Sequence, residues 1–357
     1  MPDARRPPPG FMAGAGLRRL AAGAGLCWLI TWPAAPDQPL LAGSRSVDLN
    51  LPATASAAPD SGGASRPGGR VQTEMHNVDL EIESGIVLRI RRLDGELIAT
   101  GPETPPSLDD KHSYVLSLRS AEIAIDMPSL GSLLNDHVFA YAGSPIRQLV
   151  VSSEGGELIQ RGVLSHGAGL HFEIRAIPVL TPEGMIRLHP GSIKVMGIKA
   201  GGLLKSFGMP LERLIGLAPG HGARIEGDDI ILDPTAMLPL PALRGHLTSI
   251  RVEPGLLVQT FGPAAAIETA GVAPPRSANF IRFRGGTLRF GRLTMTDTWL
   301  DIDDNDPGDP FAFSLARYND QLVAGYSQTT ADQGLVVHMP DLDKLHPAIA
   351  GTGPIRH

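Results

Sequence analysis

An Asp-rich run over residues 299–310 holds the side chains of this 357-residue chain that are best suited to bind a cation. Asp301, Asp303 and Asn305 occupy alternate positions, as in the opening of a calcium loop, and Ca²⁺ prefers about six to eight oxygen ligands. An EF-hand loop would next require glycine at position 306 and glutamate at position 312, where the chain has aspartate and alanine. We therefore expect a solvated acidic turn, with these three residues as the candidate calcium ligands.

Motifs of the common catalytic classes are absent from the sequence. There is no H-E-x-x-H zinc motif and no G-x-S-x-G nucleophile elbow. Asp228 and two nearby aspartates could supply paired carboxylates for acid–base chemistry, but charges that protect an exposed edge strand explain them more simply. We expect a non-enzymatic protein without a cofactor. An envelope glycan hydrolase that uses Asp228 or Asp301 is the minor alternative.

Apolar alternation predicts a mainly β chain with short helices. Between Val78 and Ile90 every second residue is apolar on either side of a Ser-Gly pair, which predicts a hairpin. A short helix is expected after Pro128, with Ser129 as its N-cap and apolar residues at helical spacing up to Val138. Residues 311–316 are expected to form a short helical turn. Further strands are expected over 114–127, 146–152, 157–164 and 170–180.

Residues 185–262 combine two pairs of strand-like runs with an amphipathic helix between them. The apolar residues of this helix fall at i, i+3 and i+4 spacing, which places them on one stripe. The stripe and the strand alternation together predict a curved sheet with a helix against its apolar face. The stripe suits either the wall of an apolar channel or a dry, packed core. It consists of Leu203, Leu204, Phe207, Leu211, Leu214 and Ile215.

Composition and charge limit the partners of the chain. Hydrophobic residues make up 42% of the sequence and charged residues 19%, which is typical of a globular protein. A formal net charge of -6 without a clustered basic face argues against nucleic-acid binding. The only cysteine, Cys27, lies in the N-terminal apolar segment, so no intrachain disulfide can form.

The N-terminal region has the layout of an export signal. Four arginines in the first 19 residues precede an uncharged run over 20–32, which is shorter than the roughly 20 residues that span a bilayer. We expect a signal peptide or membrane anchor over 1–35 and a disordered linker, rich in Ala, Ser, Pro and Gly, over 36–70. The remaining divisions expected are a β-rich domain at 71–262, a linker at 263–276, a β-rich C-terminal extension at 277–345 and a tail at 346–357.

Several runs resemble one bacterial family. They are the G-x-I-R-L-x-P pattern over 184–190, the L-x-x-L-I pattern over 211–215, and the closing runs LTSIRV (247–252) and GLLV (255–258) before Gly262. In this order they resemble the LmeA-like exported lipid-binding proteins, which are similar to the tubular lipid-binding (TULIP) superfamily. The resemblance covers residues 71–262. The Gly-rich insert over 220–234 and residues 263–357 depart from it.

The resemblance implies an α+β, mainly β fold in which a long curved antiparallel sheet wraps short amphipathic helices and encloses an elongated apolar cavity. It also implies binding or carriage of a lipid or other long apolar molecule in the cell envelope, in the periplasm or anchored to the inner membrane facing it, with the membrane surface as a further partner. The alternative is a scaffolding envelope protein with a filled core that binds another protein. Beside the helical stripe, the lining is expected to include Ile193, Val195, Ile250 and Val252.

Overall fold

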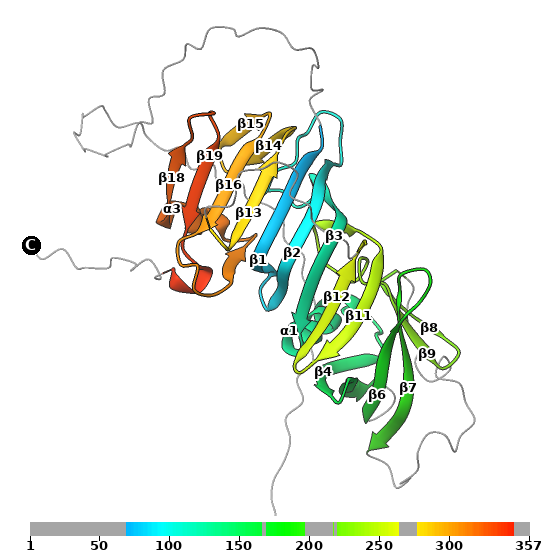
Figure 1. Cartoon of the computed structure of the whole chain (residues 1–357). Coiled ribbons are helices and arrows are strands. Elements are labelled where there is room, and N and C mark those ends of the chain that lie inside the picture. The colour runs from blue at the N-terminus through cyan, green and yellow to red at the C-terminus, as the bar shows by residue number, and fades with distance from the viewer. Residues whose placement is uncertain (1–68, 166–168, 197–216, 218–219, 264–276, 346–357) are drawn as a thin grey trace, which may run out of the picture. The chain divides into compact units, whose positions relative to one another are not determined.

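The computed structural model describes residues 69–165, 169–196, 217, 220–263 and 277–345, and these residues form a mainly β protein with short helices. Within them, eleven strands form one large, curled sheet (Figure 1). The main path of this sheet runs in the order β11 (Leu247–Glu253), β12 (Leu256–Phe261), β3 (Tyr114–Asp126), β2 (Ile86–Ala99), β1 (Val71–Glu83), β13 (Phe280–Arg284), β16 (Trp299–Asp304), β19 (Leu335–Met339) and β18 (Tyr326–Thr329).

The long hairpin of β1 and β2 forms as the alternation predicts, with its turn at Gly85 in the left-handed region (φ +80°). The alternation of buried and exposed side chains changes phase within this hairpin. Asn77 of β1 has a φ of +51°, and the register between β2 and β3 shifts between Ile90 and Arg92. Such bulges bend a strand and increase its twist. They therefore give a physical reason for the curl of the sheet.

A second sheet of six strands packs its apolar face against the same core as the large sheet. Its strands run in the order β4 (Ile146–Glu154), β5 (Glu157–Leu164), β6 (Leu170–Leu180), β7 (Ile186–Met196), β9 (Asp229–Leu232) and β8 (Ala223–Glu226). Helix α1 (Met127–Leu133) continues directly from β3 into one π-helical turn, η1 (Leu134–Val138). This helix lies beside β4 (Figure 1).

The expected helix after Pro128 is confirmed, but its N-cap is not Ser129. The carboxylate of Asp126 accepts a hydrogen bond from the backbone N–H of Ser129 (2.8 Å), so Asp126 is the N-cap and Ser129 lies in the first turn. The hydroxyl of Ser129 instead accepts from the backbone N–H of Val87 in β2 (3.3 Å). Proline in the first turn fits this earlier start.

The C-terminal strands continue the sheet that β1–β3 begin. β13 pairs antiparallel with the first half of β1, and β17 (Phe311–Ser314) pairs parallel with its second half. β10 (Ala242–Arg244) pairs parallel with β3 in the same way on the other side. The remaining elements are the hairpin of β14 (Thr287–Phe290) and β15 (Leu293–Thr296), helix α3 (Tyr318–Ala324) and the 3₁₀ turn η3 (Leu342–Lys344).

The helical turn expected over 311–316 is wrong, because those residues include strand β17. Phe311 and Phe313 alternate into the core with 0% and 2% of their surface exposed, and the parallel pairing with β1 holds them extended. The amphipathic helix expected around Phe207 lies outside the described residues.

Candidate functional site

An apolar cavity lies between the two sheets, beside α1. One wall comes from the large sheet, including Leu88 of β2 and Leu257 of β12, and the opposite wall comes from β4, β5, β7 and β9. Leu130 and Leu133 of α1 line it as well. The lining is apolar except for the amide side chains of Gln160 and Gln259.

A second apolar cavity adjoins the first within the six-stranded sheet. Its lining includes Phe172 and Ile174 of β6 and Phe139, which follows η1. The two cavities share part of their lining, namely Leu134, Gln160, Leu188 and Leu232. They therefore form neighbouring parts of one apolar interior.

The cavities are narrow. Counted as the space that the centre of a water molecule can reach, the volume of the first cavity is about 40 Å³ and that of the second is about 20 Å³. A single water needs roughly 10–15 Å³ on this scale, so the first cavity has the room of about three waters. The partly exposed residues Leu238, Leu243 and Gln259 mark the side on which the lining approaches solvent.

No ionisable side chain among the described residues lines either cavity. An anionic or cationic group placed there would lose its hydration without gaining a counter-charge, which strongly disfavours it. The arrangement therefore suits an uncharged ligand or an uncharged part of one.

Two polar side chains hold the helix that lines the first cavity. At its N-terminus, Asp126 caps Ser129 and also pairs with Arg89 of β2, at 3.0 Å between carboxylate and guanidinium. These contacts lower the pKa of Asp126 against the opposing effect of burial, which is the largest single contribution. In η1, the amide of Asn135 donates to the carbonyl of Leu149 (2.7 Å) and accepts from its N–H (2.9 Å). Asp126 thus ties the helix to β2, and Asn135 ties it to β4.

Of the predicted lining residues, the structure describes the side chains of Ile193, Ile250 and Val252, and these three are not among the residues that line the cavities. Ile250 and Val252 of β11 are partly buried against the core, opposite the lining residues Gln259 and Leu257 of β12. Ile193 of β7 is likewise partly buried and pairs with Ile174, which lines the second cavity. The other predicted residues cannot be placed in this way. Val195 is paired in β7 but its side chain lies outside the described part, as do Leu203, Leu204, Phe207, Leu211, Leu214 and Ile215.

Sequence reasoning missed the contributions of α1, β5 and the segment 234–243. The helical spacing of Leu130 and Leu133 was a usable signal, because it predicts an apolar stripe that must face a core. The proline-rich segment around Met237 offered no comparable signal, since its irregular backbone gives no periodicity from which to infer a buried face.

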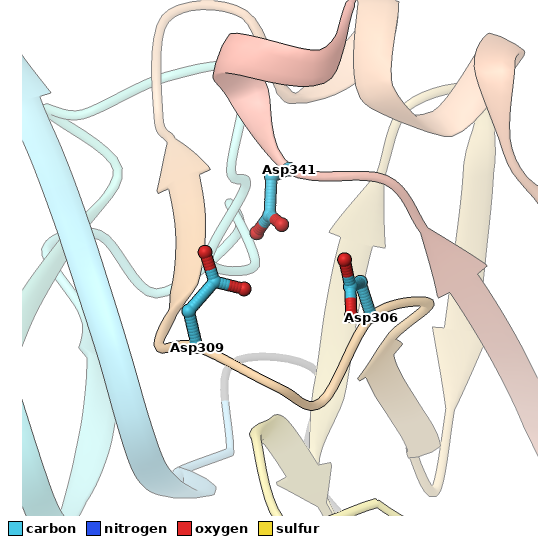
Figure 2. A group of neighbouring side chains, drawn as sticks. All are labelled: Asp306, Asp309 and Asp341. Carbon is cyan, nitrogen blue, oxygen red and sulfur yellow. The ribbon is translucent and has the colours of Figure 1, made fainter.

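A separate acidic cluster is formed by Asp306, Asp309 and Asp341, whose carboxylates converge on one another (Figure 2). The ammonium group of Lys344 lies among them, 2.7 Å from Asp306, 2.7 Å from Asp341 and 3.6 Å from Asp309. Hydrogen bonds to Asp306 and Asp341 raise the pKa of Lys344, and the same lysine lowers the pKa of Asp306. The cluster therefore carries its own counter-charge.

The predicted calcium ligands are arranged differently. Asp301 pairs with two arginines of β13, Arg282 (3.5 Å) and Arg284 (2.5 Å). Asp303 lies on the same strand and is buried, whereas Asn305 is exposed beyond the end of the strand. The two aspartates named for a hydrolase belong to different sheets, Asp228 to the β8–β9 turn and Asp301 to β16.

Comparison with known proteins does not assign the chain to a class. It matches no family model, and neither the curated proteins nor the solved structures contain a significant match. In the part of the chain that the structure describes, no helix is long and apolar enough to cross a membrane.

Proposed function

We propose that this protein binds a lipid or another long, uncharged apolar molecule, and carries or holds it in the bacterial cell envelope. The observation that supports the proposal is the pair of adjoining cavities, whose lining is apolar apart from two glutamines and includes no ionisable side chain among the described residues. The curled sheet suits the TULIP-like arrangement that the sequence resembles, and we propose that finer fold assignment as well.

Desolvation would supply the affinity. Each buried methylene contributes about 0.8 kcal/mol, so about eight methylenes would contribute roughly 6 kcal/mol before the entropy lost on binding is subtracted. Such a ligand needs few hydrogen bonds to be retained. Its selection would come from the shape of the cavity.

The narrow cavities favour a slender chain over a ring system. Binding of a whole acyl segment requires side chains to move, and Met237 is suited to this because an unbranched thioether side chain adapts its shape easily. We propose a periplasmic location, free or anchored to the inner membrane, on the basis of the apolar N-terminal segment over 20–32.

The first test is to purify the full-length chain without detergent, and to analyse it by native mass spectrometry and lipid extraction. We expect an apolar molecule to co-purify, and a slender, uncharged fluorescent acyl probe such as methyl cis-parinarate to bind with increased emission. A protein that carries no such molecule and takes up no probe would have a filled core, which would favour the scaffolding alternative.

A matched pair of variants connects the binding to the cavities. Leu188 lines both cavities and is 1% exposed, whereas Ile177 on the adjacent strand β6 is 58% exposed on the outer face. We expect Leu188→Phe to fill the shared space and weaken probe binding at least tenfold, and Ile177→Phe to leave it unchanged. Equal effects of the two substitutions would place the probe elsewhere on the protein. Circular dichroism confirms that each variant is folded.

A further inference from the structure

Gln160 is a polar residue at the centre of the apolar interior. It lies on β5 two residues from Leu158, so both side chains point to the cavity face of the strand, and Gln160 lines both cavities. Only 8% of the surface of Gln160 is exposed. The next residue, Arg161, points the other way and pairs with Glu173.

No hydrogen bond joins the amide of Gln160 to the described residues, although the amide carries two donors and an acceptor. Its atoms are also not among the fully buried polar atoms that lack a partner, so the amide keeps a small surface open to the cavity. Buried amides are normally paired, because leaving one unpaired costs free energy. The same protein shows the normal pattern at Gln321, which is 0% exposed. The amide of Gln321 donates to the carbonyls of Ala312 and Pro340, both at 2.9 Å, and accepts from the backbone N–H of Ser314 at 3.0 Å.

Water is a poor partner for Gln160 in this position. A buried water needs about two to four polar partners. Among the described residues, Gln160 is the only polar side chain that lines the second cavity, and Gln259 is the only other one that lines the first. The partner that fits is a polar atom carried into the cavity by the ligand itself.

We propose that Gln160 binds a neutral oxygen acceptor of the ligand, such as an ester or amide carbonyl, with apolar chain on either side of it. The class of ligand is therefore an uncharged lipid, for example a fatty acyl ester. A free carboxylate or phosphate at this position would lack a counter-charge. This inference rests on the proposed function, because it concerns the same cavities.

The test compares two ligands of similar length in wild-type protein and in Gln160→Leu. Full-length protein is loaded with the slender, uncharged probe methyl cis-parinarate, and n-decane or methyl octanoate is added as the competitor. The two competitors partition differently out of water, so their affinities are not compared with each other. The affinity of each competitor for wild-type protein is compared with its affinity for Gln160→Leu. We expect Gln160→Leu to weaken methyl octanoate about fivefold or more, as loss of one hydrogen bond predicts, and to leave decane unchanged or tighter.

Gln72→Leu is the matched control, because Gln72 is exposed on β1 and lines neither cavity. We expect it to change the binding of neither competitor by more than about twofold, because a solvated amide makes little net hydrogen-bond contribution. If Gln160→Leu weakens both competitors equally, or weakens neither, the assignment of Gln160 is overturned while the proposed function stands. If wild-type protein binds neither competitor nor probe, the proposed function fails as well.

A second measurement needs no ligand. Gln160 is largely buried and has no protein hydrogen bond to lose, so leucine in its place adds apolar contact, and we expect Gln160→Leu to raise the urea midpoint of unfolding. A Gln321→Leu variant should lower it, because that substitution leaves three backbone groups without their partner. A lowered midpoint for Gln160→Leu would mean that its amide is satisfied within the empty protein, which contradicts the inference.

Discussion

The N-cap of α1 allows the sharpest test of how the cavity is built. Asp126→Ala removes the hydrogen bond to Ser129, which is typically worth about 1 kcal/mol, and the contact with the half-exposed Arg89, worth roughly 0.5 kcal/mol. We expect the free energy of unfolding to fall by about 1.5 kcal/mol. For a domain of this size that lowers the melting temperature by roughly 3–6 °C.

Asp126→Asn separates the two contributions, because an asparagine oxygen can still cap the helix but carries no charge. We expect it to lose only about 0.5 kcal/mol at neutral pH. The measurement is urea unfolding followed by circular dichroism. The interpretation is wrong if Asp126→Ala unfolds at the same urea concentration as wild type, or if the asparagine and alanine variants lose the same amount.

The pH dependence of the same pair follows from the lowered pKa of Asp126. The folded state holds the pKa of Asp126 below its ordinary value of 3.8, so the charge contributes its full stability above pH 3.8, and this contribution is lost as the pH falls through the lowered pKa. The difference between wild type and Asp126→Asn should therefore be full at pH 7 and shrink in strongly acidic solution. A difference that stays constant over this range would contradict the ion-pair contribution.

Four further substitutions test other parts of the structure. The guanidinium of Arg161 holds the pKa of Glu173 down to about 2. After allowance for solvent screening, Glu173→Gln should lower the free energy of unfolding by roughly 1–2 kcal/mol at pH 7. In urea unfolding, this difference from wild type should disappear as the pH falls from about 4.5 to about 2. Gly262 and Gly255 both have positive φ, but a methyl group would overlap a backbone carbonyl only at Gly262. Gly262→Ala should therefore lose at least about 3 kcal/mol, and Gly255→Ala about 1 kcal/mol, in the same assay. A methyl group on Gly162 would lie 3.0 Å from the ring of Phe172, so the alanine variant should lose about 1 kcal/mol through overpacking, and an unchanged melting temperature would show that the ring moves freely.

The parts of the fold that depend on neighbouring residues were predictable from the sequence. The hairpin of β1 and β2 follows from local alternation and a turn glycine, and β3 ends at Asp126, just before the helical turn that contains Pro128. The pairings of β17 with β1, β10 with β3 and β16 with β19 were not predictable. Each is a parallel contact between distant segments, and alternation states which face of a strand is apolar without stating which strand lies beside it.

The same limit explains why the extension at 277–345 was expected as a separate division. Phe280–Arg284 reads as half of a local hairpin, yet β13 pairs with β1 and β16 and not with its neighbour β14. In the sequence, the Gly285-Gly286 pair is a strong signal for a two-residue hairpin turn. Both glycines do have positive φ, so that signal was correct about the backbone and uninformative about the partner strand.

The cavity lining was harder to predict than the fold, and β5 shows the reason. Leu158 and Ile159 are both apolar and both buried, at 2% and 3% exposure, although they point to opposite faces of the strand. The sequence alternation therefore leaves two arrangements open. Either Leu158 and Gln160 face the interior, or Ile159 and Arg161 do. Only the pairing of Arg161 with Glu173 on the outer face resolves the question, and that contact joins two strands. An inward-facing glutamine is the most informative residue of the site, and it is visible only once the register between β5 and β6 is known.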